Sequence, residues 1–174
     1  MSEITIISSS NREDNKSILF AELCANLLEN QGIKTNLFSL QNIPDILSGL
    51  AMYDFANSPI SDIVEKYLSP VDKLVFVIPE YNGSFPGILK LFIDAVHPSN
   101  FKNKKAALVG ISSGRAGNIR GMDHLTNILN YIKVDVYHHK VPIASIDSLI
   151  KDGNVIDENV KNRLNDLMTQ FVKF

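Results

Sequence analysis

Short apolar runs alternate with longer amphipathic stretches along this chain. The run 74–78 is apolar at five successive positions, without the polar alternation of a half-exposed strand. Strands have this pattern when helices cover both faces of their sheet, as in parallel α/β proteins. The run 34–39 is more polar, which indicates a strand near the sheet edge. We expect five strands, at 4–7, 34–39, 74–78, 106–111 and 134–137, the last extending towards Val141.

The stretches between these runs carry apolar residues at the spacing of one helix face. In the stretch 85–96 these are Phe85, Ile88, Leu89, Phe92, Ile93 and Val96. The segment 41–59 contains two prolines and a glycine, so we expect it to hold a short helix at most. The predicted helices lie at about 16–31, 62–68, 85–96, 119–132 and 160–171.

This order of elements defines the expected fold. Right-handed crossovers between successive parallel strands place helices on both faces of the sheet. Five strands in 174 residues favour an α/β flavodoxin-like three-layer sandwich with strand order 2-1-3-4-5. We expect a single domain over residues 1–174.

Composition excludes several classes of function. The net charge of −2 argues against extensive electrostatic binding to nucleic acid. Cys24 is the only cysteine, so neither an internal disulfide nor a cysteine-cluster metal site is expected, and its apolar surroundings indicate a buried small hydrophobe. We find no signal peptide or membrane-spanning run and expect a cytoplasmic protein. Lys104-Lys105 is interpreted as a solvated strand end.

Three polar loops follow strands of the predicted sheet. In the first, residues 8–17, Ser10, Asn15 and Ser17 offer hydrogen bonds and Arg12 offers a charge, at a helix N-terminus suited to phosphate. The alternative is that Asn15 only caps the helix. The acidic pair at 13–14 must point outward, or it weakens phosphate binding.

The second loop, residues 79–87, follows the run 74–78. Tyr81 and Phe85 are suited to flank an aromatic ligand, and Asn82 and Ser84 to donate hydrogen bonds. A strand-to-helix turn explains Pro86 and Gly87 but does not explain Glu80, Tyr81 or Asn82. The third loop, residues 112–118, has two glycines that expose backbone groups to a close ligand. Together the three loops predict one polar pocket at the carboxyl edge of the sheet.

The second loop reads Pro-Glu-Tyr-Asn-Gly-Ser-Phe-Pro-Gly-Ile-Leu-Lys-Leu-Phe-Ile-Asp over residues 79–94. It resembles the pattern of the NAD(P)H-dependent FMN reductases, a flavodoxin-like family that includes quinone, azo-dye and chromate reductases. Ser9-Ser10-Asn11-Arg12 and the third loop resemble the family's other two motifs, and the resemblance covers nearly the whole chain. The chain has Ser9 and Asn118 where the family usually has glycine.

The resemblance implies that FMN is the cofactor, with NADH or NADPH as co-substrate. It places Ser10, Arg12, Asn15 and Ser17 around the phosphate, and Ser113, Gly114 and Gly117 near the pyrimidine end of the flavin. It also implies a homodimer or homotetramer with the helix at 85–96 in the interface. The residues lining the ribityl chain and the isoalloxazine would be Pro79, Glu80, Tyr81, Asn82 and Ser84.

The leading hypothesis is a flavin-dependent oxidoreductase that passes hydride from NAD(P)H through FMN to a small acceptor, such as a quinone, azo compound, metal oxyanion or free flavin. The cofactor carries this chemistry, so no catalytic side chain and no metal ligand is predicted. None of the four histidines falls within the three loops. The alternatives are a flavodoxin-type electron carrier and a non-catalytic flavin-binding module.

Overall fold

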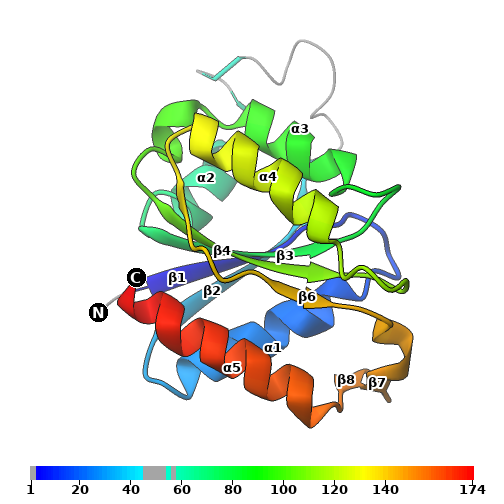
Figure 1. Cartoon of the computed structure of the whole chain (residues 1–174). Helices are drawn as coiled ribbons and strands as arrows, with labels where there is room; N and C mark the ends of the chain where they lie inside the picture. The colour runs from blue at the N-terminus through cyan, green and yellow to red at the C-terminus, as the bar shows by residue number, and fades with distance from the viewer. Residues whose placement is uncertain (1–2, 45–53, 56–57) are drawn as a thin grey trace.

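The computed structural model describes residues 3–44, 54–55 and 58–174, so most of the stretch expected to be irregular lies outside the described residues. The main sheet is parallel and has the order β2-β1-β3-β4-β5, with β6 also paired to β4 (Figure 1). This order confirms the predicted flavodoxin-like fold. Its strands are β1 (Glu3–Ser8), β2 (Lys34–Ser39), β3 (Lys73–Pro79), β4 (Lys105–Ile111), β5 (Asp135–Val136) and β6 (Val141–Ile143).

Helices cover both faces of this sheet. Figure 1 shows α1 and α5 on one face, and α2, α3 and α4 on the other. The α-helices are α1 (Ser17–Glu29), α2 (Ser61–Tyr67), α3 (Gly87–Ala95), α4 (Ile119–Tyr131) and α5 (Glu158–Lys173). Short 3₁₀ helices occur at η1 (Leu40–Asn42), η3 (Pro98–Asn100) and η4 (Ile146–Ser148).

The two faces of the sheet have separate hydrophobic cores, which explains the uninterrupted apolar strands. Val75 and Val77 of β3 pack in the core beneath α1 and α5, whereas Phe76 and Ile78 pack in the core beneath α3 and α4. Cys24 is fully buried in the first core, and this burial raises the pKa of its thiol to about 12. The interpretation of Cys24 as a buried hydrophobe is confirmed.

The fifth strand position is interrupted, which differs from the expected single strand. β5 pairs with Lys105 and Ala106 at the start of β4, and β6 pairs with the end of the same strand. Between them Tyr137 packs against α5, where its hydroxyl donates to Gln170 Oε1 at 3.0 Å. The outer strand therefore leaves the sheet and rejoins it at the carboxyl edge, beside the loop after β4.

The interpretation of Lys104 as a solvated residue was wrong. Lys104 is buried, its ammonium donates to the Val71 carbonyl, and its pKa is lowered by burial. Lys73, at the same end of the sheet, donates to the carbonyl of Val172 at 2.6 Å in the last turn of α5. A cation at a helix C-terminus is favourable because it meets the negative end of the dipole.

A small antiparallel hairpin, β7 (Ile150–Lys151) and β8 (Asn154–Val155), was not predicted. Asp152 and Gly153 between these strands both have positive φ, which is the conformation of a two-residue hairpin turn. Among the residues that the structure describes, no helix is both long enough and apolar enough to cross a bilayer.

Candidate functional site

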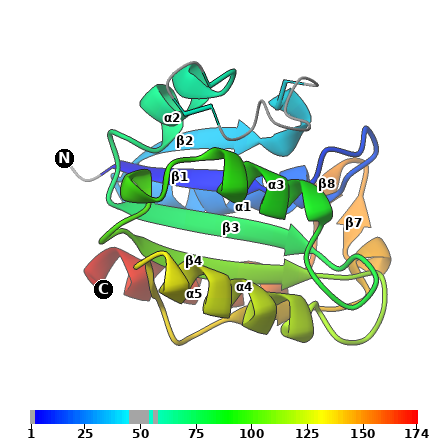
Figure 2. The ribbon, with the colours of Figure 1, turned by 90° about the horizontal axis from the view of Figure 1, so that it is seen from above.

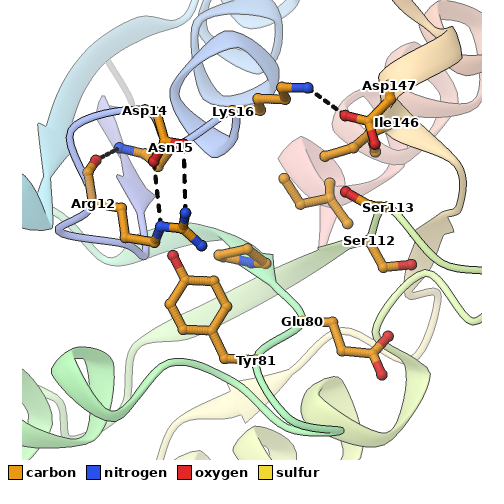
Figure 3. A pocket seen from close by; sticks show the side chains of 12 residues that line it. Arg12, Asp14, Asn15, Lys16, Glu80, Tyr81, Ser112, Ser113, Ile146 and Asp147 are labelled. Carbon is orange, nitrogen blue, oxygen red and sulfur yellow. Dashed lines mark hydrogen bonds and ion pairs between the residues drawn. The ribbon is translucent and has the colours of Figure 1, made fainter.

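The carboxyl ends of β1, β3 and β4 lie at one edge of the sheet, as Figure 2 shows for β3 and β4. A cavity of about 270 Å³, here called the first cavity, opens at this edge. Figure 3 shows that its walls come from the predicted loops and from a fourth segment, at η4. The lining residues are Arg12, Asp14, Asn15, Lys16, Pro79, Glu80, Tyr81, Ile111, Ser112, Ser113, Ile146 and Asp147.

The loop after β1 is tied to the loop after β3. The hydroxyl of Ser10 is buried and lies 2.6 Å from the hydroxyl of Tyr81. The guanidinium of Arg12 lies 5.9 Å from the centre of the Tyr81 ring, within the range of a cation–π contact. Tyr81 therefore orders the loop that carries Arg12.

Asn15 and Ser17 hold the start of α1. The Asn15 side-chain oxygen accepts from the Ile18 amide at 3.2 Å and from the Ser17 hydroxyl at 2.6 Å. Asn15 thus caps the helix, and its side chain also lines the first cavity. The buried Ser17 hydroxyl also lies 2.9 Å from the Ser8 hydroxyl.

Both acidic residues of the first loop are exposed, as expected, but Asp14 also lines the first cavity. It forms an ion pair with Arg12, whose Nε lies 3.3 Å from Asp14 Oδ1. Both side chains are mostly exposed, so the pair contributes little to stability. Arg12 can therefore change partners at little cost in stability.

The loop after β3 makes a tight turn before α3. The backbones of Tyr81 and Ser84 are hydrogen-bonded to each other, and Asn82 and Gly83 between them both have positive φ. Asn-Gly is the preferred pair for this type I′ turn because both residues tolerate a left-handed backbone. The turn thus explains Asn82, for which the sequence pattern indicates ligand binding alone.

Asn118 connects the loop after β4 to the end of β3. It is fully buried with a left-handed backbone, and its side-chain amide donates to the carbonyls of Ile78 and Pro79, both at 3.0 Å. Asparagine tolerates this backbone better than most residues, so it can replace a glycine here. Its Oδ1 is buried without a hydrogen-bond partner. Asn118 therefore aligns the loops at the edge.

A second cavity, of about 590 Å³, adjoins the first and shares three lining residues with it, Glu80, Ser112 and Ser113. Arg120 of α4 lines this second cavity and forms an ion pair with Glu80, with Nη2 3.8 Å from Glu80 Oε1. The two cavities together form an elongated groove along the carboxyl edge. The second is lined by Glu80, Asn82, Gly83, Ser112, Ser113, Gly114, Arg115, Ala116 and Arg120.

Eight of the twelve predicted site residues line this groove: Arg12, Asn15, Pro79, Glu80, Tyr81, Asn82, Ser113 and Gly114. The other four are not among the residues that line it. Ser10 and Ser17 hold the first loop through hydrogen bonds. Gly117 packs so closely on Pro142 that a Cβ at position 117 would lie 2.7 Å from Pro142 Cβ. The Ser84 hydroxyl lies 2.9 Å from Nδ1 of His124, a histidine of α4 outside the three loops.

Sequence reasoning missed the wall formed by η4 and the role of Lys16. Lys16 forms an ion pair with Asp147 (Figure 3). Hydrogen bonding from Lys16 and, to a smaller extent, from Ser113 lowers the pKa of Asp147. The residues join segments 131 positions apart, and no local motif signals such a pairing. Within the described part of the chain, no group of three acidic, histidine or cysteine side chains is placed to bind a metal.

The sequence pattern of the family described as NADPH-dependent FMN reductase matches residues 2–147. A Pseudomonas aeruginosa protein named NAD(P)H-dependent FMN reductase is 30% identical over 135 residues, covering 75% of this chain and 72% of that protein. A Burkholderia 2-hydroxy-1,4-benzoquinone reductase is 28% identical over 125 residues, 68% of each chain. The structure of FerB, a flavoenzyme NAD(P)H:(acceptor) oxidoreductase from Paracoccus denitrificans, superposes with a TM-score of 0.81 at 22% identity, covering 99% of this chain and 96% of that one.

The strand order and this structural similarity define a flavodoxin-like fold. The chain belongs to the NADPH-dependent FMN reductase family. It is accordingly an oxidoreductase with FMN as its cofactor and NAD(P)H as its co-substrate.

Proposed function

We propose that this protein uses NADH or NADPH to reduce a quinone, or a similar small acceptor such as an azo compound, a metal oxyanion or a free flavin, with FMN in the groove. In the quinone reaction, NAD(P)H and one proton are converted with the quinone to NAD(P)⁺ and hydroquinone. The observation that carries the proposal is the elongated groove shared by the loops after β1, β3 and β4.

The residues of the groove suit FMN, which combines an anionic phosphate with a flat aromatic ring. The guanidinium of Arg12 and the N-terminus of α1 meet at one end, where a phosphate is electrostatically favoured. Further along, Gly114 presents backbone with open space around the position of a Cβ, so a planar group can approach closely. Bound FMN supplies hydride acceptance and release, which no side chain provides.

The residues of the protein then bind FMN and orient it. We assign Arg12, with Asn15, Ser10 and Ser17, to the phosphate end, where the two serines hold the loop in shape. We assign residues 79–82 and Ser84 to the ribityl chain and ring, and Ser113, Gly114 and Gly117 to the pyrimidine end. The partly buried Glu80 carboxylate is balanced by Arg120.

We further propose that the protein is a homodimer or homotetramer, assembled through the outer face of α3 and α4. A largely apolar hollow of about 560 Å³ lies there, and Tyr131 beside it has 88% of its surface exposed. The same hollow contains the ion pair of Lys90 with Asp94. A two-fold interface between identical faces can set the lysine of one subunit against the aspartate of the other, which suits a second copy of this chain.

Steady-state kinetics test the proposed reaction. Protein loaded with FMN is mixed with NADH or NADPH and a benzoquinone, and both substrates are varied. We expect one NAD(P)H to be consumed per quinone and parallel double-reciprocal plots, because the two substrates use one site in turn. FMN binding without NAD(P)H oxidation would instead favour a flavodoxin-type carrier, and absence of FMN binding would contradict both.

A further inference from the structure

Lys16 and Asp147 form an ion pair at the first cavity, between the residue that precedes α1 and the 3₁₀ helix η4 (Figure 3). Both side chains line the cavity and both are about half exposed. In Figure 3 the ammonium of Lys16 points to Asp147, whereas Arg12 lies on the other side of the cavity beside Asp14. Each of these two cations thus has an aspartate as its partner.

Asp147 is positioned independently of Lys16. The Ile146 amide donates to the Ser112 carbonyl at 3.2 Å, and the Ser145 amide donates to the Gly114 carbonyl at 2.9 Å. The amides of Ser148 and Leu149 close the turn of η4 by donating to the carbonyls of Ser145 and Ile146, both at 3.1 Å. The loop after β4 therefore holds this carboxylate in place even if Lys16 leaves it.

Lys16, in contrast, can change partners. Its ammonium stands on a flexible four-carbon stem, and its pair with Asp147 is solvent-exposed, so breaking the pair costs little. Its backbone adjoins Asn15, which caps α1 at the end of the cavity that also contains Arg12. A phosphate there carries more charge than one carboxylate and meets the positive end of α1, so it competes well for the ammonium.

We propose that Lys16 is a further phosphate-binding residue of the flavin site, and that it exchanges Asp147 for the phosphate when FMN binds. This inference rests on the proposed function only for the place of FMN in the groove. Lys16 then adds affinity for FMN over riboflavin, which lacks the phosphate. Asp147 acts as the competing partner that limits this affinity.

Equilibrium binding of FMN and riboflavin to the full chain tests the exchange through quenching of flavin fluorescence. Lys16→Met keeps the aliphatic stem and removes the charge. We expect it to weaken FMN binding about tenfold, the loss of one charge-assisted contact, and to leave riboflavin binding unchanged. Asp147→Asn removes the competitor, so we expect tighter FMN binding and again no change for riboflavin.

The double variant gives a sharper test. If Lys16 exchanges partners, its contact with the phosphate is offset in the wild type by the loss of its pair with Asp147. In the Asp147→Asn background nothing offsets that contact, so Lys16→Met weakens FMN binding more there than in the wild type. Equal effects in both backgrounds would contradict the exchange.

Lys140→Met is the matched control, because Lys140 pairs with Asp123 at 2.7 Å and neither residue lines the groove. A loss with Lys16→Met no larger than with this control, or equal losses for FMN and riboflavin, would overturn the inference. Wild-type protein that binds neither flavin would overturn it together with the cofactor assignment. FMN that binds with the expected variant effects but does not accept hydride from NAD(P)H would contradict only the proposed reaction.

Discussion

The hydroxyl of Ser10 lies 2.6 Å from the hydroxyl of Tyr81, a contact between residues 71 positions apart. It joins the loop after β1, which carries Arg12, to the loop after β3, which carries Glu80. Because Ser10 is fully buried, its hydroxyl cannot replace the contact with Tyr81 by a hydrogen bond to bulk water. The shape of the phosphate end of the groove therefore depends on a tyrosine from the opposite loop.

Tyr81→Phe removes this contact and keeps the ring. We expect unfolding to require about 1 kcal/mol less free energy, the usual net value of one hydrogen bond, and FMN affinity to fall as the first loop loosens. Urea unfolding and an FMN titration measure the two effects. Unchanged stability and affinity in Tyr81→Phe would show that the Ser10 contact is dispensable.

Arg12→Ala tests the phosphate end of the groove. We expect FMN affinity to fall about ten- to a hundredfold, the range for a lost hydrogen bond to a charged group, while riboflavin affinity is unchanged. The fold should remain intact because the pair of Arg12 with Asp14 is exposed. Asp14→Asn frees the guanidinium and should leave FMN affinity equal or higher. Undiminished FMN affinity in Arg12→Ala would remove this residue from the site.

The main features of the fold could be predicted from sequence because they depend on local patterns. Uninterrupted apolar runs predict strands covered on both faces, and β3 shows why, since Val75 and Phe76 face different cores. The hairpin of β7 and β8 also had a local signal, Asp152-Gly153, but each of its strands has only two residues. So short a strand has no hydrophobic period to detect.

The site was harder to predict, because its residues serve the fold and the groove together. Asn82 belongs to a tight turn and Asn15 caps a helix, yet both line the cavities. The contact of Lys16 with Asp147 depends on the position of η4, which follows β6 in the chain. The prediction of a strand there does not determine that position. Asn118 likewise acts through the carbonyls of β3, far from it in sequence.

The contact with Lys16 also predicts a pH dependence. Lys16, and then Ser113, lower the pKa of Asp147 in the folded protein below its ordinary value. A lowered carboxyl pKa means that the stabilisation is present above the unfolded-state pKa and is lost as the pH falls through the folded-state pKa. An NMR titration of the Asp147 carboxyl should show this lowered value, and Lys16→Met should raise it. The same pKa in both proteins would show that the ion pair does not form in solution.

The proposed subunit interface predicts a change in mass. Tyr131→Glu places a charge on the α3–α4 face and should shift the protein towards the monomer, because burying an unpaired carboxylate is costly. Ile156→Glu, at another exposed apolar residue outside that face, is the control and should leave the assembly unchanged. Sedimentation velocity measures both. Wild-type protein that sediments as a monomer would contradict the assembly itself, and an unaltered oligomer in Tyr131→Glu would contradict this interface.

The central claim is that the groove holds an FMN that accepts hydride from NAD(P)H. Anaerobic titration of the FMN-loaded protein with NADH or NADPH, followed by flavin absorbance without any acceptor, tests it most directly. The account predicts that the flavin bleaches with one equivalent of at least one of the two nucleotides and regains its colour when a benzoquinone is added. Flavin that binds but keeps its full absorbance with both nucleotides would contradict it.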